Sequence, residues 1–77
     1  MTYAYILLNV EGGEEDNVLN KVKKISGVEQ AFVSYGVYDL IIKVKAENMK
    51  ELKDVVTDKI RQIDQVKSTL TLLIVDQ

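Results

Sequence analysis

The segment Tyr35-Gly36-Val37-Tyr38-Asp39 contains the residues of this chain that are best suited to binding a ligand. Gly36 permits a sharp turn, and the Asp39 carboxylate would pair with a ligand ammonium group. Further along, Thr69 and Thr71 carry hydroxyls that could bind a ligand carboxylate or amide. Simpler explanations exist, and spacing alone favours them: Asp39 would stabilise the turn through backbone amides, and threonine favours strands by propensity.

The composition excludes most catalytic chemistry. The 77 residues include no histidine and no cysteine, which removes imidazole bases, thiolate nucleophiles and the usual zinc, copper or non-haem iron sites. We therefore expect no enzyme activity, no catalytic residue, no metal and no cofactor. The chain has 10 basic against 12 acidic residues, and its lysines are interleaved with acids, so we expect no direct contact with nucleic acid.

Length and hydropathy predict a single domain over residues 1–77. The apolar runs at 4–8 and 72–75 are far too short to span a bilayer. The N-terminal residues show neither a basic region nor a cleavage signal. We expect a cytoplasmic protein that does not contact membranes.

Hydrophobic periodicity predicts the order βαββαβ. Strands are expected over 2–10, 28–35, 38–46 and 66–75, and helices over 14–25 and 49–63. Gly27 would end the first helix, while Asn48 with Glu51 three residues later forms a capping box for the second. The acids at 14–16 would complement the dipole of the first helix. Gly36 falls in a hairpin between the second and third strands.

The two halves of the chain repeat one pattern at an offset of 38 residues. Right-handed crossovers would interleave two such βαβ units into one four-stranded antiparallel sheet with both helices on one face. This is the ferredoxin-like α+β sandwich. The matched pairs run through strand, helix and strand: Ile6 with Val44, Val18 with Val56, Val22 with Ile60, Ile25 with Ile63, Val28 with Val66 and Phe32 with Leu70.

Alternation along the strands divides their side chains between two faces. The face expected beneath the helices is apolar and holds Ala4, Ile6, Leu8, Val10, Leu40, Ile42, Val44, Leu70, Leu72 and Ile74. The other face is unusually apolar for a surface in water, which favours two subunits packed sheet against sheet about a two-fold axis. On that face we expect Tyr3, Tyr5, Leu7, Ile41, Leu73 and Val75 among Asn9, Asp39, Lys43, Lys45, Thr69 and Thr71.

Nearly the whole chain resembles the effector domain of the Lrp/AsnC regulators, also called the RAM domain. The resemblance rests on the βαββαβ order, the Gly36-x-x-Asp39-Leu40 hairpin and the Thr69-x-Thr71 pair. Two turns depart from the family pattern: Ser26 stands where proline is frequent, and Gln65 where glycine is frequent. Neither change should alter the fold.

The resemblance implies a homodimer, described as a dimeric α+β barrel, that assembles further into octamers or rings. It also implies that small effectors, usually amino acids, bind between dimers near the hairpin. By position, Gly36, Tyr38 and Asp39 would form the hairpin side of that site, and Thr69 and Thr71 would come from a neighbouring subunit.

Full regulators of this family carry a helix-turn-helix domain before this module. The first predicted strand begins at Thr2, so we expect a stand-alone member that acts on transcription indirectly, with a DNA-binding relative as a candidate partner. Two alternatives stay open. One is a small cofactor-free enzyme of the dimeric α+β barrel type, and the other is a structural interaction module that binds no ligand.

Overall fold

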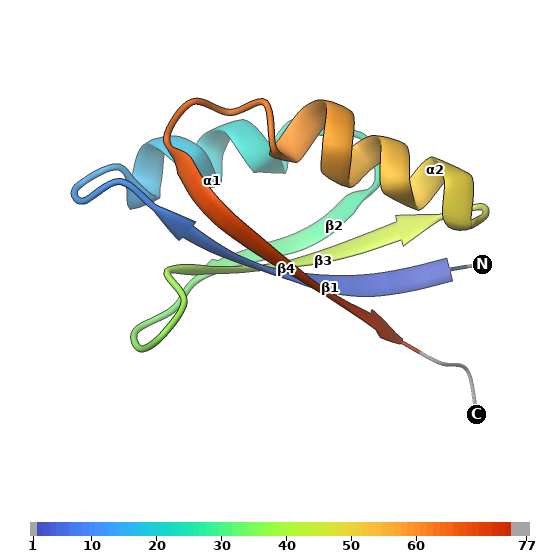
Figure 1. Ribbon diagram of the computed structural model, residues 1–77, viewed down its shortest axis with the longest axis horizontal. Coiled ribbons are helices and arrows are strands. Elements are labelled where there is room, and N and C mark those ends of the chain that lie inside the picture. Colours follow the sequence, from blue (N-terminus) through green and yellow to red (C-terminus); the bar gives the residue numbers. More distant parts are fainter. Residues whose placement is uncertain (1, 75–77) are drawn as a thin grey trace.

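The computed structural model describes residues 2–74, and the elements follow the predicted order (Figure 1). The C-terminal end of the predicted last strand, at Val75, lies outside the described residues. The elements are β1 (Thr2–Val10), α1 (Glu15–Lys23), β2 (Val28–Val33), β3 (Leu40–Ala46), α2 (Met49–Asp54), its π-helical continuation η1 (Val55–Ile60) and β4 (Val66–Ile74).

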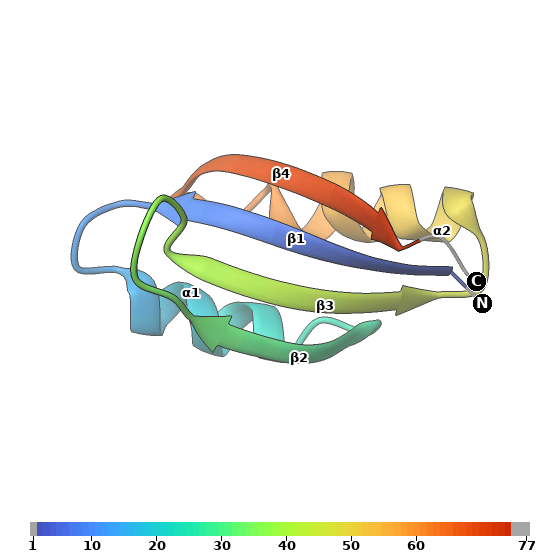
Figure 2. The same cartoon turned by 90° about the horizontal axis from the view of Figure 1, so that it is seen from below.

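The sheet is antiparallel with the strand order β2-β3-β1-β4. Both helices cover the same face, α1 on the side of β2 and α2 on the side of β4 (Figures 1 and 2). This arrangement confirms the ferredoxin-like fold. It also places the two repeated halves in equivalent positions, because β1 and β3 form the centre of the sheet while β2 and β4 form its edges.

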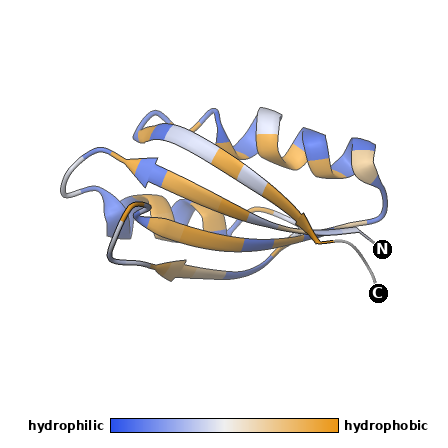
Figure 3. Ribbon diagram, turned by 60° about the horizontal axis from the view of Figure 1, so that its bottom comes forward, coloured by the Kyte–Doolittle hydropathy of each residue, from blue (hydrophilic) through white to orange (hydrophobic). Residues whose placement is uncertain are grey.

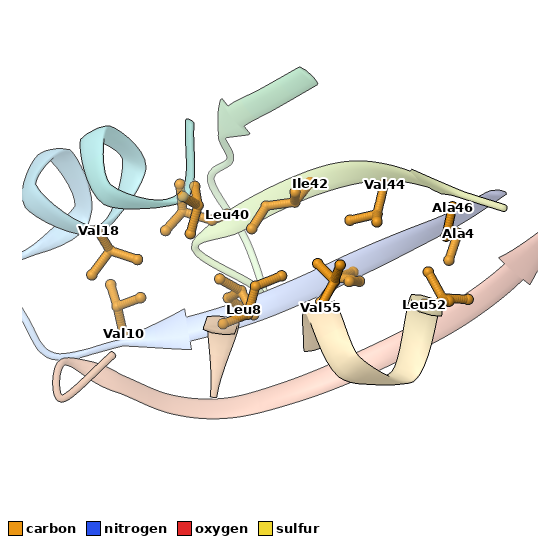
Figure 4. Close-up of a cluster of buried hydrophobic side chains, with 13 residues drawn as sticks. Ala4, Leu8, Val10, Val18, Leu40, Ile42, Val44, Ala46, Leu52 and Val55 are labelled. Carbon is orange, nitrogen blue, oxygen red and sulfur yellow. The ribbon is translucent and has the colours of Figure 1, made fainter. Parts of the chain in front are cut away.

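The core lies between the sheet and the helices, and the central strands provide most of it (Figure 4). Alternate residues of β1 and β3 are buried, as the alternation predicted. Burial of these aliphatic side chains is the main favourable term in folding. The buried set is Ala4, Ile6, Leu8, Val10, Val18, Val22, Leu40, Ile42, Val44, Ala46, Leu52, Val55 and Ile60.

The second helix begins as predicted and then changes its winding. Asn48 Oδ1 accepts a hydrogen bond from the Glu51 amide at 2.9 Å, which confirms the cap. From Val55 to Ile60 the helix is π-helical, which the regular spacing of apolar residues did not predict. Within this segment Val55 and Ile60 are buried, while Val56 is only partly buried.

A bulge in each edge strand overturns one prediction about the faces. Between Asn9 and Val10 the register of β4 shifts, so that Lys67 is an extra residue without a partner on β1. Glu29 is extra in β2 in the same way, one 38-residue repeat earlier. An extra residue inverts the alternation beyond it, and the expected faces of β4 were therefore wrong.

The pairing of β4 with β1 shows the corrected faces. Thr71 lies opposite Ile6, Thr69 opposite Leu8 and Leu73 opposite Ala4, so these three β4 residues lie on the helix side. Leu70, Leu72 and Ile74 lie opposite Leu7, Tyr5 and Tyr3 on the other face. The β4 residues that were predicted for the core thus lie on the face away from the helices. The two threonines that were predicted for that face lie on the helix side instead.

The face turned away from the helices, here called the outer face, is consequently more apolar than the sequence predicted. Figure 3 turns this side of the sheet towards the viewer and colours the strands by hydropathy. Several of its side chains are strongly exposed, among them Phe32, Leu70 and Leu72. Large exposed apolar surfaces mark interaction sites for proteins, membranes or ligands. Its apolar members are Tyr3, Tyr5, Leu7, Phe32, Ile41, Leu70, Leu72 and Ile74.

Replacing Gly27 with alanine is expected to lower the free energy of unfolding by about 1–3 kcal/mol. Gly27 has φ +99°, and an added Cβ would lie 3.2 Å from the Lys45 carbonyl oxygen. Gly12→Ala is the matched control, since Gly12 has open space around it and no positive φ. Urea denaturation measures both variants, and equal stabilities would contradict the argument.

Candidate functional site

The β2–β3 hairpin closes through a backbone hydrogen bond from the Ser34 amide to the Asp39 carbonyl oxygen, at 2.8 Å. β2 ends two residues earlier and β3 begins two residues later than predicted, so both Tyr35 and Tyr38 lie in the connection. Gly36 has φ +143°, a conformation that favours glycine. Tyr35 is 97% exposed at this turn, so the structure holds a large aromatic side chain in solvent beside a flexible backbone position.

Asp39 ties this hairpin to the end of β1. Its amide donates to the Leu8 carbonyl oxygen at 2.8 Å, and its Oδ2 accepts from the Val10 amide at 2.9 Å. The carboxylate thus stabilises the sheet end through a backbone amide, as the simpler explanation of this residue predicted. Within residues 2–74 only Oδ2 is engaged in this way, which leaves Oδ1 for another donor.

A cleft of about 450 Å³ lies between the hairpin and the first turn of α1. The structure therefore brings Gly36 and Asp39 together, but not on the outer face, where the alternation had placed Asp39. Instead the Asp39 carboxylate shares this cleft with two acids of α1. The lining residues are Glu15, Asp16, Val33, Ser34, Tyr35, Gly36 and Asp39.

All the charged residues that line this cleft, here called the hairpin cleft, are acidic: Glu15, Asp16 and Asp39. Such a wall favours a cationic group on a ligand, because a carboxylate that loses water needs a positive partner. Over residues 2–74, no three potential ligands lie close enough together to hold a metal ion. An organic cation such as an ammonium group suits the cleft.

Glu15 and Asp16 were missed as site residues. In the sequence they form part of an acidic helix start, a pattern that the helix dipole explains fully. Only the packing of α1 beside the hairpin brings them to the same cleft as Asp39. A separation of more than 20 residues along the chain contains no signal that would have predicted this.

The other predicted site residues lie elsewhere in the same copy. Tyr38 is half-buried but does not line the cleft. Thr69 and Thr71 lie on the helix side of β4, beyond β1, and Thr71 lines a separate cleft beside α2. A single copy therefore does not join the threonines to the hairpin.

The helices are short, and none between residues 2 and 74 combines the length and hydrophobicity that crossing a membrane requires.

Comparison with known proteins gives one consistent result. A family model described as the Lrp/AsnC ligand binding domain matches residues 3–77. An HTH-type transcriptional regulator of Pyrococcus abyssi is 35% identical over 97% of this chain. This chain spans about half the length of that relative, 52%.

Solved structures agree with this match. A Pyrococcus horikoshii protein superposes with a TM-score of 0.93 at 35% identity, over 100% of this chain and 93% of its own. AsnC of Escherichia coli superposes with a TM-score of 0.92 at 26% identity, over 99% of this chain and 52% of its own. The fold, the family model and the curated relatives together show that this chain belongs to the Lrp/AsnC ligand-binding domain family.

Proposed function

We propose that this chain is an effector-binding and self-associating module that takes a free amino acid in the hairpin cleft and influences transcription through its assembly. The observation that carries this proposal is the acidic cleft in which Asp39 stands beside Gly36 and the first turn of α1. Membership of a family of ligand-binding domains in transcriptional regulators supports it.

The chemistry of the cleft suits one end of an amino acid. The ligand ammonium would donate to Asp39 Oδ1, with Glu15 and Asp16 adding negative potential. The ligand carboxylate would be held by backbone amides at Gly36, where no side chain blocks approach. These assignments give the cleft a polarity that a simple amine or a simple acid would satisfy only in part.

The open side of this cleft leaves room for a neighbouring subunit. Tyr38 would support the hairpin from its half-buried position. Thr69 and Thr71 would take part only if a neighbour brought the edge of its β4 against the hairpin, because they do not reach it within one copy. A ligand held between copies favours the assembly that binds it more tightly.

The outer face supports the self-association in this proposal. Two copies packed through it would cover the exposed Phe32, Leu70 and Leu72 and form a dimeric α+β barrel. Higher oligomers such as an octameric ring would then use the hairpins. A DNA-binding relative with the same outer face is the proposed partner, and the cytoplasm the proposed location, because the curated relatives regulate transcription.

Adding the right amino acid is expected to raise the melting temperature of the pure protein. Ligand at 100 times its dissociation constant stabilises a native state by about 2.7 kcal/mol. The panel is the set of protein amino acids, tested by thermal unfolding with native mass spectrometry to follow assembly. For each amino acid that stabilises the protein, the matching hydroxy acid is the control, because it lacks the ammonium group that Asp39 would bind.

The outcomes of this panel are distinct. Stabilisation by an amino acid and not by its hydroxy acid supports the proposal. Equal stabilisation by both would show that the acidic wall does not recognise the ammonium group. No response to any amino acid would favour the alternative of a structural module without a ligand.

A further inference from the structure

A second cleft, of about 280 Å³, lies between α2 with η1 and the edge strand β4. One helix stripe forms one wall, and the helix side of β4 forms the other. Most of the lining is aliphatic, with a single charged side chain and two hydroxyls. The lining residues are Met49, Leu52, Lys53, Val56, Thr57, Thr71 and Leu73.

The internal repeat relates this cleft, here called the β4 cleft, to the hairpin cleft. At the offset of 38 residues, Glu15 in the first helix corresponds to Lys53 in the second. In the same way, Val33 at the end of β2 corresponds to Thr71, and Tyr35 in the following turn corresponds to Leu73. Each half of the chain thus forms a cleft between its helix and its edge strand. The charge is inverted between them, with an acid in one half and a lysine at the same place in the other.

A departure from regular helix geometry occurs in the wall of the β4 cleft. Val56 and Thr57 belong to the π-helical segment η1. Val55 is buried in the core, whereas Val56 is partly buried and lines the cleft. Such π-helical insertions recur at functional sites, and here the insertion turns an aliphatic and a hydroxyl side chain towards the same cleft.

We propose that the β4 cleft binds a small aliphatic monocarboxylate. The Lys53 ammonium and the hydroxyls of Thr57 and Thr71 would donate to the carboxylate, while the aliphatic chain would contact Leu73 and Met49. Between residues 2 and 74 the structure shows an ion pair for Lys43 and none for Lys53, so the Lys53 charge has no competing partner there. This site goes beyond the proposed amino-acid function and lies in a different cleft. The two sites would share only Thr71, and only where a neighbouring copy presented it to the hairpin.

The charge and the lining together decide between ligand classes. One cation beside two hydroxyls matches one anionic head group, since charged donors bind carboxylates more strongly than neutral donors do. The exposed Met49 and Leu73 gain from contact with a hydrocarbon chain. A cation or a fully polar anion would leave one of these two features unused.

Hexanoate is the probe, and the test uses the full chain. Binding is measured by calorimetry and located by methyl NMR on a sample labelled at methionine, leucine and valine. We expect saturable shifts at Met49, Leu52 and Val56, without shifts at Val33 beside the hairpin cleft. Hexylammonium is the control for charge, and we expect it not to bind at the β4 cleft.

Matched variants separate the head-group contact from general electrostatics. Lys53→Glu is expected to weaken hexanoate binding by at least about tenfold, the size expected for a charged hydrogen bond. Lys50→Glu makes the same change in charge at an exposed position of α2 outside the cleft, and it should bind as the wild type does. Thr71→Val removes one hydroxyl at nearly constant volume and should weaken binding less.

Any of these results would overturn the proposal: no saturable binding, equal weakening by both lysine variants, or shifts centred on the hairpin instead. Binding of hexylammonium with the same methyl shifts would also contradict it, because it would reduce the cleft to a nonspecific apolar surface. If another copy or a protein partner covers the cleft, the first of these results follows. Asp39→Asn should leave hexanoate binding unchanged, so failure of the amino-acid proposal is distinguishable from failure of this one.

Discussion

Leu72→Asp is expected to separate the proposed dimer into monomers, whereas Leu73→Asp leaves the dimer intact. The two leucines are neighbours in β4 and similarly exposed, at 47% and 49%. Leu72 lies opposite Tyr5 on the outer face, and Leu73 lies opposite Ala4 on the helix side. Burying an unpaired carboxylate between two sheets costs several kcal/mol, so the dimer dissociation constant should rise by at least about a hundredfold.

Sedimentation velocity over a range of concentrations measures this effect, and circular dichroism checks that each variant is folded. The comparison also tests the register of β4. Without the bulge, alternation would place Leu72 on the helix side and Leu73 on the outer face, the reverse of what is observed. If Leu73→Asp dissociated the protein and Leu72→Asp did not, the interface would lie on the helix side. If neither did, association through the outer face would be wrong.

Substitutions of Asp39 are expected to change both stability and ligand binding, because its carboxylate is proposed to stabilise the fold and to bind the ligand. Asp39→Ala removes the acceptor for the Val10 amide and should lower the free energy of unfolding by about 2 kcal/mol, the size of a hydrogen bond to a charged group. Asp39→Asn keeps an oxygen that can accept from that amide, so most of the stability should remain. Both variants should lose the stabilisation by an amino acid, since neither carries the negative charge.

Asp58→Asn is the matched control for Asp39→Asn, because it removes one negative charge at an exposed position in η1. Urea denaturation gives the stabilities, and thermal unfolding with the stabilising amino acid gives the response. A response of Asp39→Asn equal to that of the wild type would show that the ammonium group is not bound at Asp39. The loss of response in Asp58→Asn as well would point to net charge instead of a site.

The central strands and the helix cap were the parts most accessible from the sequence. Alternation in β1 and β3 predicted their buried residues correctly, because a paired central strand without a bulge repeats every two residues. Asn48 was predicted as a cap from its spacing to Glu51, and their hydrogen bond is local. Where the determining contacts lie within a few residues, the sequence contains the information.

The edge strands show why the remaining features were not predictable in the same way. The bulges at Glu29 and Lys67 depend on pairing with a distant strand, and no residue type in either strand demands them. One extra residue moved Thr69 and Thr71 to the helix side and Leu70, Leu72 and Ile74 to the outer face. A period of two makes face assignment sensitive to any single insertion.

The sequence by itself determined the element order, the internal repeat, the antiparallel α+β class and the absence of histidine and cysteine chemistry. Tertiary structure alone decided which acids share a cleft with Asp39. It also decided that Lys53 lines the β4 cleft, the equivalent cleft in the second half of the chain. The physical reason is the separation, along the chain, of the residues that interact. Secondary structure and caps follow from periodicity and neighbours along the chain, whereas a cleft is formed by side chains that only the packing of helix against sheet brings together.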